Sequence, residues 1–342
     1  MKVYIRSAGN ISPQHSLDTD SFFLSRTTTS NNYFKSVEPD YDSFIDSKMI
    51  RRMSRIVKMG VTAAITCLKE AHVEIPAAIV TATAYGCLED SSSFLRRMIE
   101  FDEKLLSPTA FIQSTHNTVG AQIALMLKCH NYNNTIVHRG LSFENALTES
   151  ILLLKEGTGP VLVGAMDEIT DDSQAILSRF GLYRKTDNRM GNIAGEGAAF
   201  FLLEKDQGKK SLAILKGLHI LYKPESNKAI QHSLLEFLKE KETTLDQIGL
   251  ILTSHTGNKK MDEQDKELMN SVFRNKVTFP FKSLCGDYPT ASGFALWMGS
   301  VILKEQMAPF WMEHGPQFPL SNILIHHHSG NSHHSFILIS ES

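Results

Sequence analysis

The 342-residue chain lacks a long apolar run, an excess of charge of either sign and any paired spacing of cysteines. No segment approaches the ~18 consecutive apolar residues of a membrane-spanning helix, and the opening residues MKVYIRSAGNISPQ lack the apolar core of a signal peptide. The formal net charge of −2 gives no indication of a nucleic-acid or polyanion surface. Apolar or mixed surroundings favour reduced thiols and a cytoplasmic location for all four cysteines: Cys67, Cys87, Cys129 and Cys285.

What is present is an ordinary globular composition, 42% hydrophobic and 21% charged, arranged as alternating strands and helices. Apolar spacings of three and four predict helices over residues 46–73, 117–128, 142–157, 228–242, 261–273 and 290–305. Short apolar runs predict strands over residues 2–9, 77–84, 134–138, 160–168, 195–205, 209–222, 248–255, 322–328 and 332–340. This alternation is typical of α/β proteins with mostly parallel sheets. The second half has a similar order of elements to the first, and no flexible linker separates them, which indicates a duplicated architecture packed as one body.

The segment NNTIVHRGLSFENALTES, residues 133–150, reads as a strand that turns sharply into a helix. Many enzymes place a nucleophile at such a turn, because the free N–H groups and positive dipole of the helix N-terminus stabilise a developing anion. Here the turn contains Arg139, Gly140 and Leu141, and none of them is a nucleophile. Ser142 opens the helix and acidic Glu144 follows, so we interpret Ser142 as an N-cap rather than as a displaced nucleophile.

Six segments, in order and with matching gaps, resemble motifs of the β-ketoacyl synthase family, which has the thiolase fold. They are the turn just described together with KMIRRMSRIVKMGVTAA, SPTAFIQSTHNTVGAQIA, VLVGAMDE, GNIAGEGAAFFLLE and KSLCGDYPTASG. The resemblance covers nearly the whole chain. It implies a single thiolase-like domain over residues 1–342, made of duplicated βαβ-rich halves in a layered α/β/α/β/α unit. The first half is expected at about residues 1–205 and the second at about residues 211–342.

The same resemblance locates the catalytic positions of the family. Its nucleophilic Cys falls on Gly140, its two His residues fall on His255 and Asp287, and its Lys falls on Lys282. In the family the Cys forms a thioester, and the two His residues assist decarboxylation of the malonyl extender and stabilise its enolate. Glycine offers no atom to acylate, and an ionised Asp287 would repel both the malonyl carboxylate and the enolate. The Gly-Phe-Gly-Gly gating loop of the family corresponds to HHHSGNSHH and keeps only Gly330.

These departures agree with one another and resemble the chain-length factors of two-subunit polyketide and polyene ketosynthases. The resemblance implies a non-catalytic subunit that pairs with an active β-ketoacyl synthase, works with an acyl carrier protein and shapes the acyl tunnel. It implies no cofactor in this chain, because the phosphopantetheine-bound acyl chain belongs to the carrier protein. Aryl polyenes and flexirubin-like pigments are the products that it suggests.

Two other functions stay open. One is a working condensing or acyl-transfer enzyme with divergent residues, of which Ser142 and His255 are the candidates. The other is a homodimeric acyl-binding scaffold. Without a thiol beside it, His255 is more simply interpreted as a buried structural histidine, and Cys285 as packing rather than as a second nucleophile.

The resemblance also indicates which residues would meet a partner. In this family the strand before the turn pairs across the dimer axis, which brings in Ile136 and His138, and an unpaired edge there would favour aggregation. The segment SPTAFIQSTHNTVG contributes four further candidates for the interface or the tunnel: Phe111, Ile112, Thr115 and His116. Phe111 and Ile112 are apolar where a solvated loop would be polar, so they either fill the core of this subunit or project across the interface.

Five histidines near the C-terminus suggest a metal site: His326, His327, His328, His333 and His334. Alternation along a strand would send His326 and His328 to one face and His327 to the other. No Cys or paired carboxylates lie nearby in the sequence, so we predict no physiological metal site.

Overall fold

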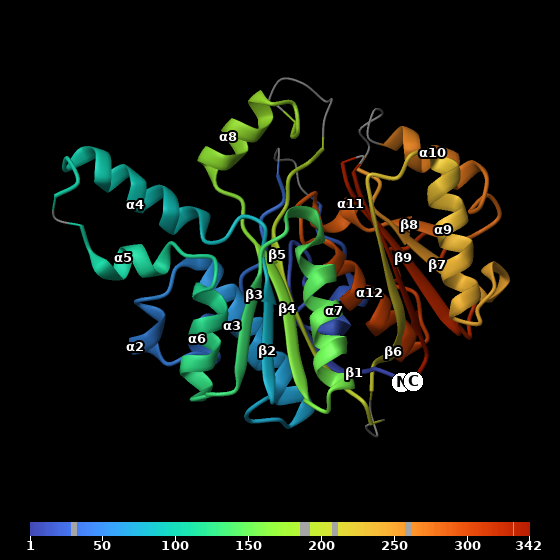
Figure 1. Cartoon of the computed structure of the whole chain (residues 1–342), viewed down its shortest axis with the longest axis horizontal. Coiled ribbons are helices and arrows are strands. Elements are labelled where there is room, and N and C mark those ends of the chain that lie inside the picture. The colour runs from blue at the N-terminus through green and yellow to red at the C-terminus, as the bar shows by residue number, and fades with distance from the viewer. Residues whose placement is uncertain (29–32, 105, 185–191, 207–210, 257–261, 331) are drawn as a thin grey trace.

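The computed structural model describes residues 1–28, 33–104, 106–184, 192–206, 211–256, 262–330 and 332–342. Within them, ten strands form one continuous sheet in the order β3-β2-β4-β5-β1-β6-β10-β9-β7-β8 (Figure 1). The strands are β1 (Tyr4–Ile11), β2 (Ala78–Ala82), β3 (Tyr132–Ile136), β4 (Val161–Asp167), β5 (Gly197–Glu204), β6 (Ala213–Tyr222), β7 (Ile248–Thr253), β8 (Thr278–Pro280), β9 (Asn322–Ser329) and β10 (His333–Ser340).

The sheet repeats one arrangement of strands. Read from one edge, the strands of the first half come in the order third, second, fourth, fifth and first of their half. Read from the opposite edge, the strands of the second half come in the same order. In each half the three outer strands are parallel and the remaining neighbours are antiparallel. Residue pairs between β1 and β6, such as Tyr4 with Ile214, join the two halves. The predicted α/β fold with duplicated halves is confirmed, and the expected boundary at about residues 205–211 falls between β5 and β6. The expectation of a mostly parallel sheet is wrong, because five of the nine pairings between the described strands are antiparallel.

Helices cover both outer faces of the sheet and fill the space between its halves. The first half is covered by α3 (Arg55–Ala71) and α6 (Thr118–Leu127). The second half is covered by α9 (Asn227–Glu240) and α10 (Asp262–Asn270). Because successive residues of a strand point to opposite faces, the side chains of β5 alternate between an outer cluster with α3 and a central cluster. The layers therefore follow the predicted α/β/α/β/α order.

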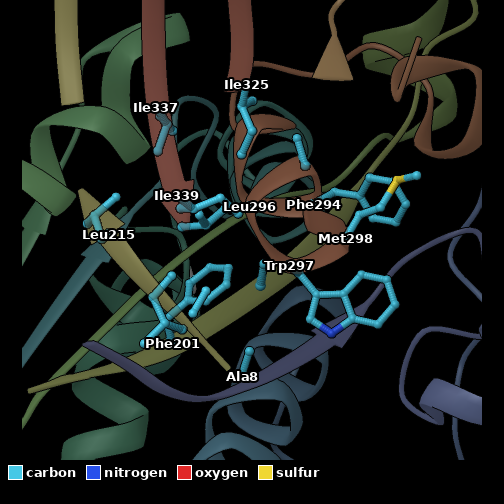
Figure 2. Close-up of a cluster of buried hydrophobic side chains, with 14 of the residues drawn as sticks. Ala8, Phe201, Leu215, Phe294, Leu296, Trp297, Met298, Ile325, Ile337 and Ile339 are labelled. Atoms are coloured by element: carbon cyan, nitrogen blue, oxygen red, sulfur yellow. The ribbon is translucent and has the colours of Figure 1, made fainter. Parts of the chain in front are cut away.

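The central layer contains α7 (Ser142–Lys155) and α12 (Ser292–Glu305). The first twelve residues of α12 are all buried, as expected of a helix that is apolar on every side. Figure 2 shows Phe294 of α12 in one cluster with Phe201 of β5 and Ile325 of β9, so this helix packs against both halves of the chain. Burying one such aromatic side chain contributes roughly 1.5–3 kcal/mol.

The other helices lie toward the ends and edges of the sheet. They are α1 (Thr19–Leu24), α2 (Ser47–Ile50), α4 (Leu88–Glu100), α5 (Pro108–Gln113), α8 (Asp171–Arg179) and α11 (Lys282–Cys285), with 3-10 turns η1 (Tyr41–Ser43), η2 (Arg139–Leu141) and η3 (Leu245–Gln247). At the left of Figure 1, α4 and α5 extend away from the body, and neither helix has a buried residue. We refer to α4 and α5 together as the arm. None of the described helices combines the length and apolar character needed to cross a lipid bilayer.

Two predicted segments differ from the structure. The long helix expected over residues 46–73 is divided into α2 and α3, because the side chain of Asp46 caps a first short helix by accepting from the Lys48 N–H at 2.8 Å. The segment treated as a loop is helix α5. Ser107 accepts from the Ala110 N–H at its start, and a proline stands in its first turn, where the missing N–H costs nothing.

Candidate functional site

The hydroxyl of Ser142 closes the turn between β3 and α7. The His138 N–H donates to Ser142 Oγ at 2.8 Å, and Ser142 donates in turn to the Arg139 carbonyl at 2.8 Å. The predicted N-cap role of Ser142 is wrong, because Leu141 is the N-cap and no side chain caps the helix. The predicted strand also ends earlier, at Ile136, so that His138 already belongs to the turn. Ser142 is fully buried, and its hydroxyl bonds two backbone groups of the turn and so fixes the conformation of the turn. We refer to this pair of bonds as the clamp.

The position where the resemblance placed the nucleophile is filled from the other half of the chain. Gly140 is buried in η2. A Cβ atom at this position would overlap both Cβ and Oγ of Ser329, the last residue of β9. Ser329 belongs to the segment that corresponds to the rewritten gating loop. Gly140 is therefore required by packing, and any larger residue would have to displace the end of β9.

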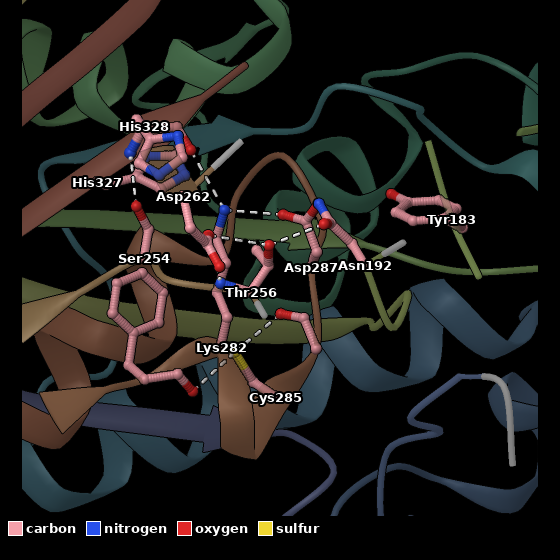
Figure 3. Close-up of polar contacts among 12 residues, drawn as sticks. Tyr183, Asn192, Ser254, Thr256, Asp262, Lys282, Cys285, Asp287, His327 and His328 are labelled. Carbon is pink, nitrogen blue, oxygen red and sulfur yellow. Dashed lines mark hydrogen bonds and ion pairs between the residues drawn. The ribbon is translucent and has the colours of Figure 1, made fainter. Parts of the chain in front are cut away.

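Lys282 and Asp287 form an ion pair with 2.7 Å between Nζ and Oδ1 (Figure 3). The Asn192 amide donates to the other carboxylate oxygen of Asp287 at 2.5 Å, and Lys282 also donates to the His328 carbonyl at 3.2 Å. Burial alone would raise the pKa of Asp287, but the attraction and hydrogen bond of Lys282, with the bond from Asn192, lower it. Asp287 is therefore ionised at neutral pH, and the charge of Lys282 is neutralised by it.

A cavity of about 250 Å³ brings the turn and this ion pair together. Arg139 lines it from the turn, Ser329 from the end of β9, and Lys282 and Asp287 from the start and the end of the α11 segment. The remaining lining residues are Tyr85, Leu182, Tyr183, Asn192, Thr256, Tyr288, Pro289, His328, Gly330, Ser332 and His333. Most of these are polar and come from segments far apart in the chain. His328, Gly330 and His333 stood in the histidine-rich segment noted in the sequence, whereas no sequence pattern marked Tyr85, Leu182, Tyr183, Asn192 and Thr256.

His255, the other remnant position, is half-buried just after β7 and does not belong to the described lining of this cavity. Its neighbour Thr256 does. The Thr256 hydroxyl donates to the Asn192 side-chain oxygen at 2.7 Å, and the Thr256 N–H donates to Asp262 at 3.0 Å. Thr256 and Asn192 thus hold the Asp287 carboxylate in place from behind (Figure 3).

A buried pair links the helix after the turn to β9. One carboxylate oxygen of Glu144 lies 3.0 Å from His327 Nδ1 and accepts from the Ser335 hydroxyl at 2.9 Å. Burial outweighs the attraction of Glu144 and lowers the pKa of His327, so the neutral imidazole donates its Nδ1–H to the carboxylate. From its place in the sequence, Glu144 is expected only to accompany an N-cap. Its partners come from the far end of the chain, which explains why that role was missed.

His326, His328 and His334 occupy the opposite face of the sheet from His327, as the alternation predicted for the first two, whereas His333 lies beside His138 at the turn. The rings of His326, His328 and His334 lie 5.6 to 6.0 Å apart, and His326 stacks on Phe336 of the outer core. His327 points to the other face, toward Glu144. Among the described residues, no group of three or more His, Cys, Asp or Glu side chains is arranged to hold a metal ion.

The arm places its candidate interface residues at the surface. Phe111 and Ile112 are 57% and 63% exposed, so the alternative that they fill the core of this subunit is wrong. The Phe111 ring packs at 5.6 Å from Phe94, which joins α5 to α4. His116 is exposed, and the Thr115 hydroxyl bonds to the Ile112 carbonyl at 2.9 Å.

The edge strand β3 and the turn after it hold the two other candidates. Ile136 is half-buried against the central core, whereas His138 is exposed and lies 2.7 Å from the Asn145 amide nitrogen through Nδ1. β3 pairs with β2 on one side and ends the described sheet on the other. Its outer row of N–H and C=O groups is therefore open to another chain.

Comparison with known proteins confirms the resemblance to the family. Residues 27–179 match the family model of the β-ketoacyl synthase N-terminal domain. No curated protein matches the sequence. The structure of the ishigamide ketosynthase/chain length factor is similar with a TM-score of 0.82 and 16% identity, over 100% of this chain and 99% of that one.

Two further solved structures are similar over the full chain. One is the type II polyketide synthase acyl carrier protein complex AntDE:AntF, with the ketosynthase bound to the hexaketide, at a TM-score of 0.79 and 13% identity over 100% of this chain and 99% of that one. The other is the ketosynthase ApeO in complex with its chain length factor ApeC from Xenorhabdus doucetiae. Its TM-score is 0.74 and its sequence identity 14%, over 100% of this chain and 98% of that one. At these identities the similarities establish the thiolase-like ketosynthase fold.

Proposed function

We propose that this chain, a relative of the β-ketoacyl synthases, is a non-catalytic, chain-length-factor-like subunit that pairs with an active β-ketoacyl synthase. In this role the partner carries the thioester and elongates an acyl chain delivered on the phosphopantetheine arm of an acyl carrier protein. The chain itself supplies neither a nucleophile nor a cofactor. The observation that carries the proposal is Gly140, which has no atom to acylate and whose side-chain space is occupied by Ser329.

The ion pair of the cavity supports the same conclusion. Where the family has its second catalytic His, this chain has an ionised carboxylate held by Lys282 and Asn192. A malonyl carboxylate or an enolate placed beside Asp287 would meet a charge of its own sign. Lys282 cannot offset that repulsion, because it is already paired with Asp287.

The surface supports a protein partner. Of the nineteen large apolar side chains that are exposed among the described residues, eight fall between residues 95 and 137, in or near the arm and β3: Leu95, Ile99, Phe101, Phe111, Ile112, Leu125, Tyr132 and Val137. This concentration, beside an open strand edge, favours an obligate interface, and such interfaces typically bury more than ~2,000 Å². Pairing through β3 would satisfy its open backbone groups, and the arm would then reach toward the acyl tunnel of the partner. We therefore expect self-association or poor solubility when the chain is produced alone.

The similar structures support the choice of partners. They are structures of a ketosynthase with its chain length factor and of a ketosynthase with an acyl carrier protein. We extend the proposal to polyene products of the aryl polyene or flexirubin type, which rests on the motif resemblance alone. Mass spectrometry of the product made by the reconstituted complex would test that extension.

The acylation state of the isolated chain tests the absence of a nucleophile. After incubation with acyl-thioesters, intact-mass measurement should show no covalent adduct, whereas an active ketosynthase treated in parallel should gain one acyl group. A stable adduct that maps to Ser142 or Cys285 would contradict the proposal and favour a divergent enzyme.

Product length tests the chain-length role. In the reconstituted complex, Phe111→Ala should allow longer chains, because a smaller side chain at the tip of the arm would narrow the partner's tunnel less. The matched control is Phe310→Ala, which removes an exposed ring that lies outside the arm. Unchanged product lengths from a Phe111→Ala complex that still assembles would remove Phe111 from the tunnel.

A further inference from the structure

Arg139 stands at the cavity with its charge uncompensated. It is one of two basic side chains with a permanent charge in the described part of the lining, and the other, Lys282, is paired with Asp287. No described residue forms a hydrogen bond or an ion pair with the Arg139 guanidinium. Among the residues that the structure describes, the lining therefore combines two cations with one carboxylate and leaves the positive charge of Arg139 in excess.

The backbone of the turn holds Arg139 in an unfavourable conformation. Its φ of 49° lies in the left-handed region, which L residues other than Asn and Asp rarely adopt. The clamp by Ser142, which accepts from the His138 N–H and donates to the Arg139 carbonyl, holds this conformation. Backbone strain of this kind persists where the surrounding structure enforces it, and such positions cluster at ligand sites. Glycine would relieve the strain, yet the chain has a long cationic side chain here.

The groups beside Arg139 offer hydrogen-bonding partners rather than a countercharge. The rings of His138 and His333 lie 6.1 Å apart beside the turn. Burial lowers the pKa of His333, and His138 and Arg139 lower it further. The hydroxyl groups of Tyr85 and Tyr183 lie 3.4 Å apart in the cavity wall and add hydrogen-bonding groups without charge.

We propose that this cavity binds a small oxyanion, a carboxylate or a phosphate group, with Arg139 as the residue that pairs with it. A guanidinium forms two parallel hydrogen bonds to either group, and such charge-assisted bonds are among the strongest in proteins. A volume of about 250 Å³ accommodates the anion with a short carbon chain. The inference concerns this chain by itself and does not depend on its pairing with a ketosynthase.

Saturation-transfer NMR on the full chain tests the site with three probes: sodium propanoate, inorganic phosphate in competition with it, and propanamide as a neutral isostere. Propanoate should bind saturably and propanamide should not. Phosphate should displace propanoate, and the relative strengths of the two anions identify the preferred group. Equal binding of propanoate and propanamide, or no saturable binding of either anion, would overturn the proposal without any mutation.

Two substitutions then locate the anion. Arg139→Gln, which removes the charge but keeps a polar side chain, should weaken propanoate binding about tenfold, and Arg139→Lys, which keeps the charge, should retain part of it. The control Arg97→Gln removes the same charge from an exposed position on α4 and should leave binding unchanged. Wild-type affinity in a folded Arg139→Gln protein, checked by circular dichroism, would contradict the assignment.

Discussion

Helix α12 and the arm use the same kinds of apolar residue under opposite conditions. α12 buries each of its first twelve residues between the two halves of the sheet, whereas α4 and α5 bury none. Phe294 is fully enclosed, while Phe111 is 57% exposed and has one aromatic neighbour. The difference shows which apolar residues maintain the fold and which ones are available to a partner.

A matched pair of substitutions gives the largest expected effect. Phe294→Ala should lower the free energy of unfolding by about 3–5 kcal/mol, because it removes a ring from a core that cannot collapse around the gap. Phe111→Ala should change it by less than about 0.5 kcal/mol in the isolated chain. Urea denaturation of both variants measures the two values. Similar losses would mean that the arm is part of the core and would remove the contrast between the two regions.

A similar contrast exists inside the site, where Asp287 is ion-paired with Lys282 and Arg139 has no ion-pair partner among the described residues. Lys282→Met should destabilise the chain by roughly 3 kcal/mol, the lower end of the range for breaking a buried pair, since Asp287 keeps some exposure. The double variant Lys282→Met/Asp287→Asn should recover much of this loss, because no buried charge is then left unpaired. If the double variant is no more stable than Lys282→Met, the pair is not the source of the effect.

The pH dependence of the pair has a definite sign. The folded-state pKa of Asp287 is lowered, so its contribution to stability is present above the unfolded value of about 3.9 and is lost as the pH falls through the folded-state pKa. The stability difference between wild type and Asp287→Asn should therefore be constant near neutral pH and shrink below about pH 4. A difference that grows on acidification would show that Asp287 is protonated in the folded chain.

A smaller effect is expected where the two halves meet at the turn. Gly140→Cys should cost about 1–3 kcal/mol through overpacking against Ser329. Adding Ser329→Gly should restore most of the stability, whereas Ser329→Ala should not, because the overlap includes the Cβ atom. Thermal unfolding of the four proteins measures the coupling. None should gain full synthase activity, since Asp287 would still oppose the enolate.

Substitutions on the arm should have the smallest effect on stability but a clear effect on assembly. Ile112→Glu should leave the isolated chain within about 0.5 kcal/mol of wild type and impair pairing with the ketosynthase. Ile176→Glu makes the same change at an exposed position on α8 and serves as the control. Size-exclusion chromatography of the co-expressed subunits compares them. Equal assembly of both variants would place the interface elsewhere.

The sequence was sufficient to predict the fold because its information is local. Apolar runs and spacings located most of the strands and helices of both halves, and the ordered motifs supplied their arrangement. Errors arose where a tertiary contact decides the local structure. Ser142 has the sequence context of an N-cap, but its hydroxyl bonds the preceding turn instead.

The site was predicted in part. Lys282 and Asp287 belong to one motif and were found together, because five residues of chain hold them close. Ser329, Asn192 and Glu144 were missed, since each acts on a residue from a different part of the chain: Gly140, Asp287 and His327. A packing requirement at a glycine cannot be read from the glycine alone.

The central claim is that this chain is the inactive member of a pair, and native mass spectrometry tests it most directly. The chain is co-expressed with a ketosynthase encoded beside it that retains the Cys-His-His set, purified through a tag on this chain and incubated with acyl-thioester. The account predicts a 1:1 complex in which the acyl group resides on the ketosynthase alone. A homodimer that excludes the ketosynthase, or an acyl group on this chain, would contradict it.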